Sequence, residues 1–176
     1  MLSNIAKYDS NEAHELRALF ETRLRELYWV EKSMIPLLAH IVENISSLDL
    51  SAVLTDHALE TVAQISRLEV IFKNIGIEPQ VRKYDAINCL INESEDMLNN
   101  TKPGVVRDAG VISVIQIMKH YEIACYGTMK AFAIALREED IVAMLEHTLN
   151  EEKQIDILLT QIAESHINIE AADKEI

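Results

Sequence analysis

Apolar residues recur at intervals of three and four positions along four long stretches of the chain, which is the spacing of a buried helix face. Little interrupts these stretches, because only four of the 176 residues are glycine and three are proline. Long helices should therefore dominate, and the fold is predicted to be all-α. With 49% hydrophobic residues at this length, residues 1–176 are expected to form one domain, with its core at about residues 12–165.

Four long helices are predicted, at about residues 11–45, 51–74, 105–137 and 139–165. Pro36 lies inside the first, where it is expected to bend the helix without ending it. A shorter amphipathic helix at about residues 83–100 lengthens the connection between the second and third long helices. Four long helices with one long crossover are typical of a ferritin-like four-helix bundle. The last residues, "NIEAADKEI", are expected to be a solvated end.

The charge of the chain narrows the classes of partner. Its formal net charge of −13 repels nucleic acid phosphates and anionic lipid, and it attracts cations, metal ions included. The N-terminus has no basic segment followed by an apolar run, and no stretch approaches the ~20 apolar residues of a membrane span. The two cysteines fall inside helical patterns, so reduced thiols are expected. We expect a soluble cytoplasmic protein that binds neither nucleic acid nor membrane.

Each of the four apolar faces is interrupted near its middle by a glutamate. These residues are Glu31, Glu60, Glu122 and Glu152. The first two are 29 positions apart and the last two 30, with offsets of 91 and 92 between the pairs. The helices therefore look like a duplicated pair, and the four carboxylates are expected at one level of the bundle.

The carboxylates predict a metal centre. Gln64 follows Glu60 by one turn and Asp156 follows Glu152 by one turn, so each pair shares a helix face. Buried carboxylates repel one another and take up protons unless a cation compensates. Hard oxygen donors suit iron or manganese, and carboxylate-rich bundle cores hold such metal pairs. We predict two metal ions, iron or manganese, bound by Glu31, Glu60, Gln64, Glu122, Glu152 and Asp156.

Other interpretations of these residues stay open. A lone glutamate in an apolar stripe is usually a boundary residue that reaches water, and the set as a whole is otherwise a degenerate bundle or a polar network without metal. Gln64 and Asp156 are either ligands or hydrogen-bonding partners of ligands. His57, one turn before Glu60, is a candidate ligand or orienting residue, with a satisfied core histidine as the alternative.

The segments "LRELYWVEK", "DHALETVAQISRLEVIF", "KHYEIACYGT" and "LNEEKQIDILLTQIA" resemble the YciF/YciE-like ferritin-like proteins, a bacterial stress-associated family. The resemblance covers roughly residues 15 to 165. It implies a helical bundle with a dinuclear metal site and a homodimer, and its site positions fall on the six residues predicted above. Family members commonly carry a glutamate where this chain has Lys119, so the resemblance leaves open whether this chain holds one metal or two.

Two hypotheses about function follow. The leading one is a dinuclear metal oxidoreductase of ferroxidase type, which activates dioxygen or peroxide while Fe(II) or Mn(II) is oxidised. The alternative is a non-enzymatic, self-associating stress protein whose metal site is stabilising or degenerate. Iron storage is a third possibility, and it requires a hollow cage of many subunits.

Overall fold

The computed structural model describes residues 11–173, and all regular structure in this range is helical. The helices are α1 (Asn11–Asn44), α2 (Leu48–Asn74), α3 (Asp85–Asn100), α4 (Val105–Ala135), α5 (Glu139–Ile162) and α6 (Asn168–Asp173), with a π-helical turn at Ala163–Ile167 before α6. The predicted all-α bundle with an extra helix in the crossover is confirmed. Pro36 lies inside α1, which continues through it.

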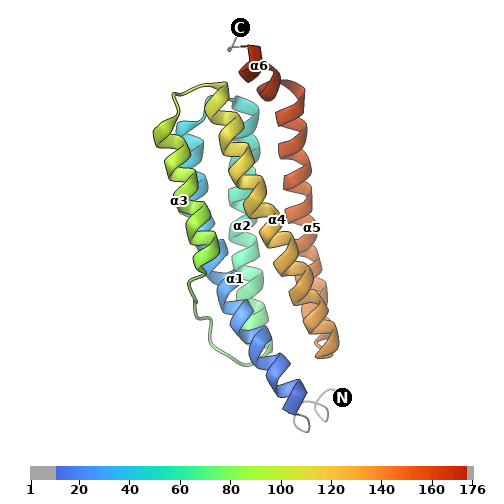
Figure 1. The fold of residues 1–176 in the computed structure, drawn as a ribbon. Coiled ribbons are helices and arrows are strands. Elements are labelled where there is room, and N and C mark those ends of the chain that lie inside the picture. Colours follow the sequence, from blue (N-terminus) through green and yellow to red (C-terminus); the bar gives the residue numbers. More distant parts are fainter. Residues whose placement is uncertain (1–10, 174–176) are drawn as a thin grey trace.

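The four long helices form an elongated bundle (Figure 1). α1 packs against α2, α2 against α5, α5 against α4, and α4 against α1, so the four helices close a ring. α3 lies outside the ring against α4 and α1. Because α3 carries the chain back along the bundle, α2 and α4 run in the same direction (Figure 1). This is the crossover arrangement expected of a ferritin-like bundle.

Local chemistry explains the ends of α2. Ser47 caps the start of the helix, where its hydroxyl accepts a hydrogen bond from the backbone N–H of Leu50 at 3.2 Å. The carboxylate of Asp108 on α4 accepts the backbone N–H groups of Ser46 and Ser47, at 3.0 and 2.8 Å, and ties the turn to the bundle. Gly76 ends α2 at a φ of 75°, the left-handed conformation that favours glycine.

The core consists of two apolar clusters along the bundle. One includes Met34, Leu38, Leu54 and Ile115, and the other includes Phe20, Leu24, Phe72 and Met129. On each of the four long helices, fully buried polar residues lie between the positions that belong to one cluster and those that belong to the other. Together they form a polar layer inside the bundle. The polar layer is therefore shielded from water by apolar side chains on both sides.

The helical bundle ends in a buried turn, and the described part of the predicted solvated end, residues 168–173, follows it. Ala163 and Ile167 in the π-helical turn are buried, and the turn contacts α4. α6 then continues to Asp173 without burying any of its side chains, while residues 174–176 lie outside the described range. Among the described residues, no helix is both long and apolar enough to cross a bilayer.

Candidate functional site

Three of the four predicted glutamates meet in the polar layer. Glu31 on α1, Glu122 on α4 and Glu152 on α5 are all fully buried, and so is Gln64 on α2. Each lies on its helix at three- and four-residue spacing from buried apolar neighbours, so the packing of those neighbours forces the polar side chain inward. All four helices of the ring therefore contribute one predicted residue to the same interior.

A lysine ammonium lies among these carboxylates. Lys119 on α4 is fully buried, and its Nζ is 2.8 Å from a carboxylate oxygen of Glu152 and also pairs with Glu122. The same Nζ is 2.8 Å from Nε2 of His57. The ammonium, which has three N–H donors, thus has three polar groups close to its Nζ. Burial lowers the pKa of Lys119, but the charges of Glu122 and Glu152 outweigh burial and raise it above its ordinary value.

His57 links the lysine to the surface of α2. Its ring is buried, and its Nδ1 is 3.5 Å from a carboxylate oxygen of Glu60. Burial, and secondly the charge of Lys119, lowers the pKa of His57, which favours the neutral ring. A neutral ring accepts from Lys119 through Nε2 and carries its proton on Nδ1, toward Glu60. His57 is thus a satisfied core histidine, one of the two interpretations of this residue.

Glu31 is the buried acid that Lys119 does not contact. The hydroxyl of Tyr126 donates a hydrogen bond to its Oε1, and its Oε2 has no hydrogen-bond partner among the described residues. Burial, and secondly the charge of Glu152, raises the pKa of Glu31 to about 8. Burial also raises the pKa of Glu122, whereas the charge of Lys119 lowers it. At neutral pH, the proton on Glu31 and the charge of Lys119 both reduce the net negative charge of the layer.

Gln64 joins the layer to a second network at its edge. Its Nε2 donates to Glu152 at 2.8 Å and to Glu151 at 3.1 Å. Arg67 holds Glu151 through two hydrogen bonds of 2.8 and 3.0 Å, a bidentate arrangement. Burial raises the pKa of Glu152, but the charge of Lys119 and the hydrogen bonds from Lys119 and Gln64 act together in the opposite direction, and the pKa of Glu152 lies below its ordinary value. Glu152 is therefore the best-supported anion of the layer.

The prediction that Glu60 is buried in the layer is wrong, because half of its side chain is exposed. The buried positions of α2 step from His57 to Thr61 and then to Gln64, so Glu60 falls at the edge of the buried face. Asp156 also lies aside. Its side chain accepts a hydrogen bond from Gln116 at 3.1 Å and pairs with His120 at 3.5 Å on α4.

The residues present do not fit a dinuclear metal centre. Among the described residues, no group of three or more histidine, cysteine, aspartate and glutamate side chains is arranged to hold a metal ion. The Lys119 ammonium holds the position between Glu122 and Glu152, and Glu60 faces outward. An ammonium and a metal ion compete for the same carboxylate oxygens, so metal binding at this pair requires Lys119 to leave. Metal ligation by the six predicted residues stays a prediction.

Two residues of the layer carry roles that the pattern of apolar residues did not indicate. Lys119 lies three positions before Glu122 and so near the same helix face, although an isolated lysine is costly to bury. Tyr126 lies four positions after Glu122 and so shares its face, which is the signal that identifies it. Cys125, three positions after Glu122, also fits the helical spacing but is only half-buried.

Comparisons with known proteins agree with this architecture. The profile of the family described as Domain of unknown function (DUF892) matches residues 15–172. Protein YciF of Escherichia coli strain K12 is 34% identical over 152 residues, which cover 86% of this chain and 92% of YciF. The crystal structure of the E. coli stress protein YciF superimposes with a TM-score of 0.83 at 32% identity, covering 87% of this chain and 97% of YciF.

Two further structures show similar bundles. YcfI of Rhodopseudomonas palustris, described as a candidate structural protein, superimposes with a TM-score of 0.81 at 36% identity and covers 82% of this chain and 92% of its own. A protein from Xanthomonas campestris shares 16% identity with a TM-score of 0.72, over 92% of this chain and 99% of its own. The second likeness concerns the fold alone.

Proposed function

The chain belongs to the DUF892 family of YciF-like proteins, and from this premise we propose that it is a non-enzymatic, stress-associated helical bundle whose internal cation is Lys119. The observation that carries the proposal is the buried ammonium, which contacts Glu122, Glu152 and His57 together. The stress protein YciF and the candidate structural protein YcfI, both similar in sequence and fold, support it.

Charge balance gives the physical reason. Buried carboxylates in an apolar bundle need a positive partner, and a lysine with three acceptors supplies one within the chain. A divalent ion in the same place would have to displace the ammonium and leave it buried beside a positive charge, which costs several kcal/mol unless the lysine finds water. The layer thus stabilises one packing of the helices without a bound metal.

The second candidate function is the dinuclear iron or manganese oxidoreductase, with dioxygen or peroxide as its oxidant. Buried oxygens without partners favour it, namely Oε2 of Glu31, Oε1 of Gln64 and Oε1 of Glu122. These are hard donors of the kind that iron and manganese prefer. This candidate requires Lys119 to move out of the layer, and a ligand role for Glu60 requires that side chain to turn inward.

Metal analysis separates the two candidates. Protein purified without chelators should contain well under one iron or manganese ion per chain, and it should not accelerate Fe(II) oxidation. Lys119→Glu replaces the ammonium with a carboxylate, so this variant should gain metal and show a melting temperature that rises with added Mn(II). Lys130→Glu is the control, because it makes the same substitution on α4 at a partly exposed lysine, which pairs with Glu146. One or two metal ions per wild-type chain would overturn the proposal.

Self-association is the second part of the proposal. On the outer side of α2, Leu59, Val62, Ala63, Ser66 and Val70 are exposed, and the exposed carboxylates of Glu60 and Glu69 lie next to them in the sequence. On a chain of net charge −13, two copies meet with less repulsion through these five uncharged residues than through the carboxylates around them. Light scattering should give twice the 20.0 kDa chain mass. Val62→Glu should give monomers, and a monomeric wild type would contradict this part.

A further inference from the structure

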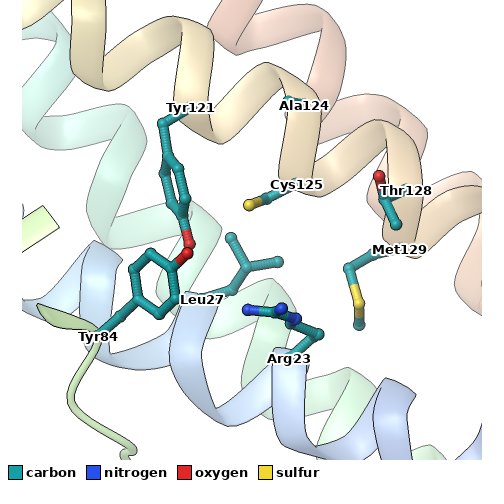
Figure 2. A pocket seen from close by; sticks show the side chains of 8 residues that line it. All are labelled: Arg23, Leu27, Tyr84, Tyr121, Ala124, Cys125, Thr128 and Met129. Atoms are coloured by element: carbon teal, nitrogen blue, oxygen red, sulfur yellow. The ribbon is translucent and has the colours of Figure 1, made fainter. Parts of the chain in front are cut away.

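A separate pocket opens on the side of the bundle between α1, α4 and the segment that leads into α3 (Figure 2). Its cavity of about 250 Å³ is lined by Arg23 and Leu27 of α1, by Tyr84, and by Tyr121, Ala124, Cys125, Thr128 and Met129 of α4. The side chains of Tyr84, Tyr121, Cys125 and Arg23 point toward a common space (Figure 2). None of these residues contributes to the buried lysine layer described above.

The pocket combines aromatic walls with polar hydrogen-bond donors. The rings of Tyr84 and Tyr121 stack with centroids 5.2 Å apart, and the guanidinium of Arg23 lies 5.8 Å from the centroid of the Tyr84 ring. Burial raises the pKa of Tyr121 and of Cys125, so both keep their protons at neutral pH. A protonated thiol is a weak nucleophile, and the pocket is accordingly suited to reversible binding.

The charge at the mouth favours an anion. Glu26 pairs with Arg23 at 2.8 Å and with Arg82 at 3.4 Å, so two guanidinium groups share one carboxylate. These three groups together carry one positive charge, on a chain whose net charge is −13. The guanidinium of Arg23 is partly exposed, which leaves N–H donors for a ligand carboxylate.

We propose that this pocket binds a small aromatic carboxylate with a single ring. The stacked tyrosines, Leu27 and Met129 would take the ring, and Arg23 would take the carboxylate. The volume fits this class, because a cavity of about 150 Å³ holds benzene and the remaining space admits a carboxylate. The inference is independent of the proposed function, since it uses different residues.

Benzoate is the probe, titrated into the uniformly 15N-labelled full chain and followed by amide chemical shifts. Saturable shifts are expected at Tyr84, Tyr121 and Cys125. Neutral benzyl alcohol should bind about tenfold more weakly, because it lacks the charge-assisted contact to Arg23. Arg23→Gln should weaken benzoate binding about tenfold, and Ala124→Leu, which adds bulk to an exposed position in the pocket wall, should abolish it.

Arg25→Gln is the matched control, because Arg25 lies on the same helix, pairs with Glu21 at 3.8 Å and does not line the pocket. Its benzoate affinity should equal that of the wild type. Circular dichroism melts confirm that each variant is folded before titration. Absence of saturable shifts in the wild type would overturn the inference, and so would equal loss of affinity in Arg23→Gln and Arg25→Gln or equal binding of benzoate and benzyl alcohol.

Discussion

The two helix pairs of the bundle share one spacing of glutamates, but the burial and the partners of these glutamates differ between the pairs. In the α4–α5 pair, Glu122 and Glu152 are both buried and share the Lys119 ammonium. In the α1–α2 pair, Glu31 is buried beside a tyrosine hydroxyl and Glu60 reaches water. A repeated spacing therefore places residues at similar levels, but the partner on the neighbouring helix decides whether an acid is ionised, protonated or exposed.

Removal of the Lys119 ammonium should cause the largest loss in the free energy of unfolding. Lys119→Met leaves Glu152 buried without its cation, and breaking a buried ion pair in this way costs about 3–5 kcal/mol. Urea denaturation at pH 7 measures the loss. Lys130→Met removes a partly exposed pair with Glu146 and should cost less than about 1 kcal/mol. Similar losses for the two lysines would show that Lys119 is not the anchor of the α4–α5 pair.

The acids of the two pairs should respond unequally to neutral substitution. Glu152→Gln removes the charged partner of Lys119 and should destabilise the protein by about 2–3 kcal/mol. Glu31→Gln should cost less than about 1 kcal/mol at pH 6, because Glu31, with its pKa raised to about 8, already carries a proton there and the amide oxygen can still accept from Tyr126. Denaturation curves that rank the two variants in the opposite order would contradict the assignment of charge to Glu152.

Stability should fall as the pH rises from about 6.5 to 8. Glu31 holds a proton in the folded chain up to a pKa of about 8, whereas the unfolded chain releases it near the ordinary value of 4.5. The folded state therefore binds more protons in this window, so the contribution of Glu31 is complete below pH 4.5 and is lost through pH 8. The expected loss between pH 6.5 and 8 is about 1–2 kcal/mol. Glu31→Gln should flatten this part of the profile, and an unchanged slope in the variant would refute the raised pKa.

The smallest effect is expected at Glu60. Half of its side chain is exposed, and its contact with His57 is a long one of 3.5 Å, so Glu60→Gln should change the free energy of unfolding by less than about 0.5 kcal/mol. The variant should also melt at the wild-type temperature with and without Mn(II). A metal-dependent stabilisation of the wild type that Glu60→Gln removes would instead favour the dinuclear candidate.

Much of the architecture could be predicted from the spacing of apolar residues. The long helices begin and end within about three residues of their predicted bounds, because Gly76, Pro103 and Gly104 interrupt the pattern clearly. Burial of Glu31, Glu122 and Glu152 could also be predicted, since each replaces an apolar residue between two others of its stripe. These are properties of single helices, which a sequence reports directly.

The chemistry of the layer depended on contacts between helices and was harder to predict. On α2 the stripe continues from His57 by four residues to Thr61 rather than by three to Glu60, and both steps are compatible with helical periodicity. The burial of Lys119 depends on His57 of α2 and Glu152 of α5, which are 62 and 33 positions away from it in the sequence. Only the fold brings these two residues into contact with Lys119. A lysine without known partners is expected at the surface, so its identity alone could not reveal this role.

The central claim is that Lys119 occupies the place of a cation between Glu122 and Glu152. Crystals soaked with Mn(II) and measured for anomalous scattering test it most directly. The account predicts no anomalous peak in the layer and continuous density for the Lys119 side chain, with Nζ within hydrogen-bonding distance of Glu122, Glu152 and His57. An anomalous peak bound by Glu122 and Glu152, with the Lys119 side chain displaced, would contradict it.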